Sequence, residues 1–197
     1  MRVRTAEIMP TPKEIDLSEE QVVTVDHGWF VAKLEKPIYA DDAGLVDVGT
    51  KFAEAFCVGV GDEPNRIHLQ RDRTMRDEEY ALEIEPGEIT VTAANRAGFM
   101  HALATIDHLR AGPLLPVGTV RDHPRLPIRG LHVMVEKIHQ LRAESILSLM
   151  RSAARHKLNT LLLELGDRFP FEGEYAVAAA PNALSRPELR RIIDEAR

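Results

Sequence analysis

Two short apolar runs decide the fold of this chain: IRGLHVMV, Ile128–Val135, and TLLLEL, Thr160–Leu165. The first is strongly apolar and of strand length. The second is nearly continuously apolar, which is typical of strands buried on both faces in a parallel sheet. Between them, apolar residues recur at helical spacing over Ala143–Leu158. The pattern predicts a strand, a helix and a second strand parallel to the first.

A second helix is expected to follow. Ser185 and Glu188 have the spacing of a capping box, and Pro187 suits the first helical turn. Residues 128–197 therefore predict two βα units, the beginning of a larger (β/α)8 or TIM barrel of roughly 250 residues. Two strands leave open sheet edges and uncovered apolar surface, so we also expect the isolated chain to self-associate.

The residues before this region have another pattern. Tyr80–Ile84 and Ile89–Val91 alternate apolar and polar residues around the turn Pro86-Gly87, which predicts a hairpin. Asn95 is a suitable cap for a helix after the hairpin. Residues 1–112 are therefore predicted to form an α/β domain with a mostly antiparallel sheet. Further strands are expected at Gln21–Val25, Gly28–Lys33 and Arg66–Gln70.

Residues 113–127 contain four prolines and are predicted to be a linker between the two parts. In the first part, an additional helix is expected to end near Phe56, with Asp41 or Asp42 as its cap.

The composition is that of a soluble globular protein, with 44% hydrophobic residues, 28% charged residues and a net charge of −6. Because no basic stripe is present, nucleic acid is not expected as a partner. No apolar run approaches the ~18 residues of a membrane span. No apolar segment follows Met1–Glu7, so no signal peptide is visible and a cytoplasmic location is expected. The single cysteine, Cys57, has apolar neighbours and is expected to be buried and inert.

Several blocks of sequence occur in the order and spacing of one enzyme family. They are EYALEIEPGEITV (Glu79–Val91), AGFMHALATI (Ala97–Ile106), VRDHPRLPIRGL (Val120–Leu131) and RHKLNT (Arg155–Thr160). Together they resemble the non-catalytic second domain and the first barrel segments of glycoside hydrolase family 20, the β-N-acetylhexosaminidases. LELGDRFPFEG, Leu163–Gly173, is similar to a segment of the hexosaminidase D type and its bacterial relatives.

This chain departs from the common family pattern at two places. Met134 and Lys137 stand where many members have an aspartate and an arginine. Leu162 and Glu164 stand where many have two histidines. These departures favour the divergent D-type branch.

The resemblance implies a retaining glycosidase that removes terminal β-linked GlcNAc or GalNAc. In this family the 2-acetamido group of the substrate is the nucleophile, an aspartate holds it, and the adjacent glutamate protonates the leaving oxygen. The family places that acidic pair at the end of the fourth barrel strand. We therefore expect no catalytic residue in this chain, no activity of the fragment, and no cofactor or metal. The expected partner is an N-acetylhexosamine-containing oligosaccharide or glycoconjugate.

Three residues are candidates for substrate binding. Arg129 matches the family arginine that binds the 3- and 4-hydroxyls of the sugar, with a structural ion pair as the alternative. Asp167 matches a family aspartate near the pocket, with a loop cap as the alternative. Glu164 lies in an apolar strand and needs a partner, expected to be Arg129, so it either supports the site or forms a buried salt bridge.

Other polar residues are interpreted as structural. His132 and His139 lack companions at metal-ligand spacing, Trp29 is expected in the core, and Glu136 is a weaker candidate near the site. Three acidic pairs are expected on the solvated surface: Asp62-Glu63, Asp77-Glu78 and Asp194-Glu195. The alternatives to an enzyme portion are a non-catalytic carbohydrate-binding or scaffold module, or an unrelated stand-alone α/β binding protein.

Overall fold

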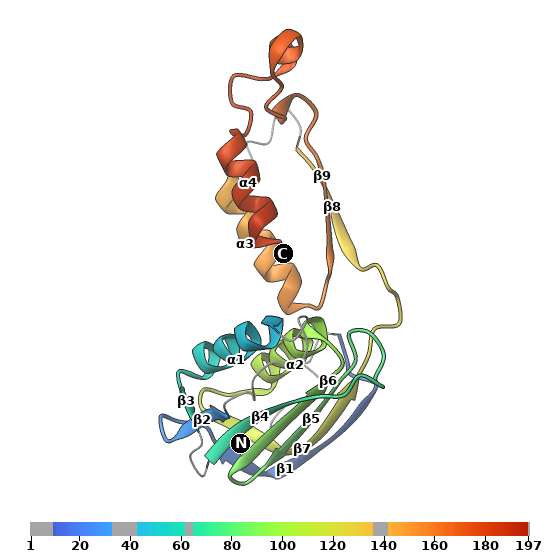
Figure 1. Cartoon of the computed structure of the whole chain (residues 1–197). Helices are drawn as coiled ribbons and strands as arrows, with labels where there is room; N and C mark the ends of the chain where they lie inside the picture. Colours follow the sequence, from blue (N-terminus) through green and yellow to red (C-terminus); the bar gives the residue numbers. More distant parts are fainter. Residues whose placement is uncertain (1–9, 33–42, 62–64, 136–141, 197) are drawn as a thin grey trace. The chain divides into compact units, whose positions relative to one another are not determined.

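The computed structural model of the chain describes residues 10–32, 43–61, 65–135 and 142–196. It consists of two compact units, unit 1 with residues 1–125 and unit 2 with residues 126–197 (Figure 1). Five of the predictions concern residues outside the described ranges: Asp41, Asp42, Asp62-Glu63, Glu136 and His139.

Unit 1 is built on a seven-stranded sheet in the order β1-β7-β5-β6-β4-β2-β3. Its strands are β1 (Glu14–Thr24), β2 (Trp29–Ala32), β3 (Gly59–Gly61), β4 (Asn65–Arg71), β5 (Tyr80–Glu85), β6 (Glu88–Ala93) and β7 (Leu114–Asp122). The sheet is antiparallel from β1 to β6 and parallel from β6 to β3. The prediction of a mostly antiparallel sheet is therefore corrected to a mixed sheet. The sequence predicts the β5–β6 hairpin, but only the fold decides that β6, and not β5, lies beside β4.

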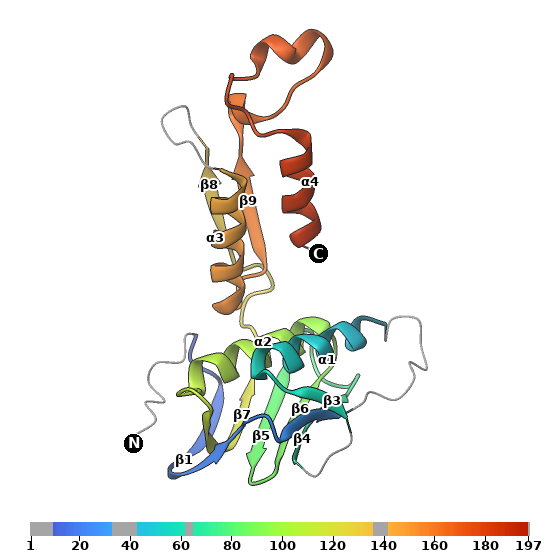
Figure 2. The ribbon, with the colours of Figure 1, turned by 90° about the vertical axis from the view of Figure 1, so that its left-hand side faces the viewer.

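Two helices, α1 (Ala43–Phe56) and α2 (Arg96–Leu109), cover one face of this sheet (Figure 2). Phe52 of α1 and Phe99 of α2 are fully buried, and Trp29 is buried in the same cluster, as predicted. The predicted hairpin is confirmed by pairing from Tyr80 with Ala93 through to Glu85 with Glu88. The predicted cap is also confirmed, because Asn95 Oδ1 accepts a hydrogen bond from the Gly98 amide at 3.1 Å.

The proline-rich stretch predicted to be a linker instead contains β7, which lies between β1 and β5. Pro116 is tolerated because pairing with β5 covers only the residues from Gly118 onward, so its missing amide breaks no bond on that side. On the other side the β1–β7 register shifts between Leu17 and Val22. At Gly118, φ is +140° and a Cβ atom would lie 2.1 Å from the Asp16 carbonyl oxygen, so this irregularity requires glycine.

Unit 2 contains a parallel pair of strands, β8 (Gly130–Met134) and β9 (Thr160–Glu164), in a sheet of their own. The helices α3 (Ala143–Arg155) and α4 (Arg186–Glu195) lie on one side of this pair (Figures 1 and 2). The predicted parallel arrangement is confirmed, and so is the capping box of Ser185 and Glu188. The small core contains Ala143, Ile146, Leu147, Leu184 and Ile192, with Leu161 and Leu163 of β9 packed against it.

The apolar strand β9 is covered on one face. Leu161 and Leu163 pack on the helical core, whereas Leu162 between them is 59% exposed. The expectation of a strand buried on both faces is therefore wrong for this chain, because α3 and α4 cover one side of the pair and alternate residues point to the other side.

Cys57 is exposed and not buried as expected. It has a left-handed backbone conformation (φ 55°) directly after α1, where the chain leaves the helix. Among the described residues, no helix is long and apolar enough to cross a membrane.

Candidate functional site

The carboxyl end of β9 carries an ion pair that sequence reasoning missed. Glu164 is the last residue of β9, and its Oε2 lies 3.0 Å from Nε2 of His132 in β8. The register pairs Leu162 with His132, so Glu164 is two residues further along on the same face. Both side chains are about half exposed, at 50% for His132 and 56% for Glu164. They therefore lie on the open face of the pair, with Leu162 and away from the helices.

Arg129 lies at the other end of the strand pair, so the expected Arg129–Glu164 contact is corrected. The Arg129 carbonyl accepts from the amides of Asn159 and Thr160, just before β9 begins. Glu164 is four residues further along β9 than Thr160, which in a strand corresponds to roughly 13 Å. The Arg129 guanidinium donates to the carbonyls of Lys157 at 2.9 Å and Leu126 at 2.7 Å. These hydrogen bonds lie at the amino end of the strand pair. A sugar-binding role of Arg129 stays a prediction.

Asp167 lies just past β9, in the short 3-10 helix Gly166–Arg168, with a side chain that is 28% exposed. Its carbonyl accepts from the Ala180 amide at 2.7 Å. The neighbouring Arg168 is buried and donates from Nη1 to the Asn182 carbonyl at 3.4 Å. Asp167 and Glu164 are thus both near the carboxyl end of β9, which is where ligand sites form in βα proteins.

Three exposed aromatic residues follow Asp167 and were also missed. Phe169, Phe171 and Tyr175 are 43%, 37% and 64% exposed, respectively. The rings of Phe169 and Phe171 meet edge to face, with centroids 5.0 Å apart. Tyr175 lies in the 3-10 helix Gly173–Ala178, which has no buried residue. The pattern FPFEGEY is the signal in the sequence: three aromatic residues beside glycine and proline, outside any α-helix or strand.

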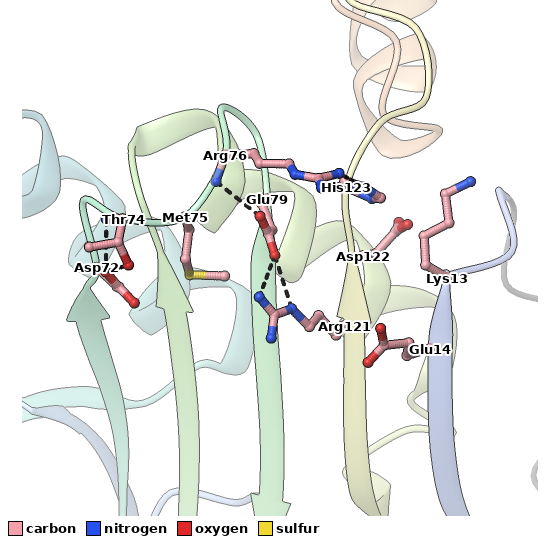
Figure 3. Close-up of a pocket in the computed structure, with 10 residues that line it drawn as sticks. All are labelled: Lys13, Glu14, Asp72, Thr74, Met75, Arg76, Glu79, Arg121, Asp122 and His123. Carbon is pink, nitrogen blue, oxygen red and sulfur yellow. Dashed lines mark hydrogen bonds and ion pairs between the residues drawn. The ribbon is translucent and has the colours of Figure 1, made fainter.

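Unit 1 has a charged groove of about 340 Å³ at one end of its sheet (Figure 3). Glu79 lies at its centre, with a buried side chain that accepts from the Arg76 amide at 2.9 Å. Its other oxygen accepts from Arg121 Nε at 2.9 Å and Nη2 at 2.7 Å. The remaining lining residues are Lys13, Glu14, Asp72, Thr74, Met75, Asp122 and His123.

The central charged residues of this groove bond to neighbouring groups. Burial raises the pKa of Glu79, but the hydrogen bonds from Arg76 and Arg121 outweigh it and leave the pKa below its usual range. Asp72 is bonded by the hydroxyl and amide of Thr74, which lower its pKa. Arg76 in turn contacts His123. These contacts stabilise this end of the sheet.

The prediction that Asp77 and Glu78 both lie on the solvated surface is only partly correct. Glu78 is 17% exposed and lies 3.5 Å from His101, which is 11% exposed, so Glu78 is mostly buried and paired. Asp194 and Glu195 do lie on the surface, bonded to Arg190 and Arg151, respectively. In the described part of the chain, no three His, Cys, Asp or Glu residues are placed to hold a metal.

Comparison with known proteins shows the family of the chain. Residues 5–123 match the family model described as glycosyl hydrolase family 20, domain 2. That range includes β7, in agreement with its place in the sheet. Over 133 residues the chain is 32% identical to a beta-hexosaminidase of Akkermansia muciniphila, a match that covers 56% of this chain and 27% of the relative.

Solved structures show the same fold over nearly the whole chain. The N-acetyl-beta-hexosaminidase of Streptomyces plicatus, in complex with Thio-NAglucal, has a TM-score of 0.76 at 21% identity and covers 100% of this chain. The exo beta-N-acetylglucosaminidase of Vibrio harveyi, in complex with N-acetylglucosamine, has a TM-score of 0.72 at 18% identity and covers 99%. The chain spans 44% and 35% of these two proteins, respectively. The family predicted from the sequence is confirmed, and its branch is not resolved: the chain belongs to glycosyl hydrolase family 20, with residues 5–123 as its domain 2.

Proposed function

We propose that this chain is part of a retaining exo-β-N-acetylhexosaminidase that acts on terminal β-linked GlcNAc or GalNAc. The observation that carries the proposal is the parallel pairing of β8 with β9 in a sheet separate from that of unit 1. Strand, helix, strand and helix in this order are the building units of a (β/α)8 barrel. The Akkermansia and Streptomyces relatives, named as beta-hexosaminidases, and the Vibrio relative, named as an exo beta-N-acetylglucosaminidase, support the same assignment.

Within this proposal the two units have different roles. Unit 1 is a support domain, because its central charged groups bond to one another. Unit 2 provides one wall of the pocket through Glu164 and Asp167, whose carboxylates can accept hydrogen bonds from sugar hydroxyls. The catalytic aspartate and glutamate are expected outside this chain, in the later strands of the barrel. A cytoplasmic location and membership of the D-type branch are parts of the same proposal.

The test is an assay with chromogenic N-acetyl-β-glucosaminide and N-acetyl-β-galactosaminide. The 197-residue chain is expected to show no turnover, whereas a longer protein that continues this sequence into a full barrel is expected to hydrolyse at least one of them. Turnover by the chain alone would refute the account of the catalytic pair. A full-barrel protein that hydrolyses neither compound would refute the proposed activity.

We also propose that the isolated chain associates with a second copy through the open face of β8 and β9. Leu162 at 59% exposure and Met134 at 51% exposure form an apolar surface there. Replacing Leu162 with Asp is expected to shift the chain toward monomer in sedimentation velocity, without loss of stability. A stable monomer of the unmodified chain at high concentration would contradict this.

A further inference from the structure

The segment between β9 and α4 is a loop with a fixed base. The carbonyl of Asp167 accepts from the Ala180 amide at 2.7 Å, and the carbonyl of Arg168 accepts from the Leu184 amide at 2.9 Å. Arg168 and Leu184 are each only 5% exposed, so both ends of the loop are packed into unit 2. The loop extends past the carboxyl end of β9 (Figure 1). Its ends are therefore held in place while its middle projects outward.

The middle of this loop exposes aromatic rings that the core does not use. Phe169, Phe171 and Tyr175 all lie outside the buried cluster of unit 2, with exposed fractions between 37% and 64%. The edge-to-face contact of Phe169 and Phe171 fixes two of the rings against each other. Large apolar side chains grouped at the surface on an anchored loop are typical of a binding surface.

The composition of the loop indicates what kind of ligand suits it. Residues 169–180 contain no lysine and no arginine, and the Arg186 guanidinium that reaches this loop is already paired with Glu172. The loop residues themselves therefore supply no cation for a phosphate or another anion. Asp167, two residues before Phe169, and Glu174 offer carboxylate oxygens that accept hydrogen bonds. A pyranose ring matches this combination, because one face presents C–H groups to an aromatic ring while its hydroxyls at the edge donate to carboxylates.

We propose that Phe169, Phe171 and Tyr175 form an aromatic platform that binds a sugar ring of an N-acetylhexosamine-containing oligosaccharide. The choice of sugar rests on the proposed function, whereas the aromatic platform itself rests on the exposure and anchoring of the loop. The platform adjoins Asp167 in the sequence and lies past the end of β9, so it supplies an aromatic part of the pocket that the substrate-binding candidates Glu164 and Asp167 lack.

The test is a nuclear magnetic resonance titration of the 197-residue chain with di-N-acetylchitobiose. Shift changes are expected in residues 166–178 and not in unit 1. Tyr175→Ala is expected to weaken binding about tenfold, the value of one aromatic contact. Tyr175→Phe keeps the ring and is expected to bind nearly as well as the unmodified chain. Val177→Ala is the matched control, because Val177 is 94% exposed in the same 3-10 helix and belongs to no cluster.

Two results would overturn the platform. One is a titration in which the sugar leaves the loop signals unchanged, and the other is an equal loss of affinity in Tyr175→Ala and Val177→Ala.

The same variants in the full-barrel protein separate this proposal from the proposed function. If that protein hydrolyses an N-acetylhexosaminide and Tyr175→Ala leaves its KM for the disaccharide unchanged, the activity stands and the platform is wrong. If Tyr175→Ala lowers the melting temperature and leaves KM unchanged, the rings pack inside the protein, and the platform is wrong as well. If the unmodified protein hydrolyses no N-acetylhexosaminide, the proposed function fails.

Discussion

Both units are built from strands and helices, but unit 1 buries its large apolar side chains more completely than unit 2. In unit 1 the sheet and its two helices bury a large cluster that includes Phe52, Phe99 and Trp29. In unit 2 the core is much smaller, and large apolar residues such as Leu162 and Tyr175 remain exposed. The charged groups differ too, because Glu79 of unit 1 is buried and paired while Glu164 of unit 2 is half exposed. The difference indicates that unit 1 can support a structure by itself, whereas unit 2 presents surface for further contacts.

The largest expected effect is in the core of unit 1. Phe99→Ala removes a fully buried ring from α2 and is expected to lower the free energy of unfolding of unit 1 by about 3–5 kcal/mol. Urea unfolding followed by the fluorescence of Trp29, which lies in the same cluster, measures it. The matched variant in unit 2, Ile146→Ala, also removes a fully buried side chain but is expected to leave the Trp29 transition in place. If both variants shift the Trp29 transition equally, the two units are not independent.

A smaller effect is expected at the groove of unit 1. Glu79→Gln removes a charge that bonds to Arg121 and the Arg76 amide. It is expected to lower the free energy of unfolding by about 1–2 kcal/mol. The contribution depends on pH, because the folded pKa of Glu79 lies below its ordinary value of 4.5. The stabilisation is complete above the unfolded pKa and is lost as the pH falls through the folded pKa.

Thermal unfolding between pH 7 and pH 3 checks this. The difference in melting temperature between the unmodified chain and Glu79→Gln is expected to be smaller at pH 3 than at pH 7. Glu83→Gln, at an exposed position in β5, the strand that begins directly after Glu79, serves as the control and is expected to change little. A difference that grows as the pH falls would contradict the assignment.

The smallest effect is expected at the ion pair on the open face of unit 2. His132 and Glu164 are both about half exposed, and a cross-strand pair of this kind contributes about 0.2–1 kcal/mol. A double-mutant cycle with His132→Ala and Glu164→Ala, followed by thermal unfolding, measures the coupling. A coupling well above this range would mean that unit 2 is held together by its open face as firmly as by its helical core.

Local patterns predicted much of both units. The hairpin around Pro86-Gly87, the Asn95 cap and the Ser185–Glu188 capping box are all as expected, because each depends on residues close in sequence. Asp167 was correctly expected after the second strand of unit 2, at its carboxyl end. The aromatic residues after it were visible in the sequence, but their exposure was not, because exposure depends on what the rest of the fold covers.

The sequence by itself determined the family, the local elements and the parallel pair in unit 2, since periodicity, caps and motif order are written along the chain. Only the tertiary structure decided which strands are neighbours: that β7 fills the proline-rich stretch, that β6 lies beside β4, and that Glu164 meets His132 instead of Arg129. The physical reason is that strand pairing and register join residues far apart in sequence. The local sequence around a proline or a charged residue therefore does not show whether the residue lies in a linker or in a sheet, because that depends on the strand beside it.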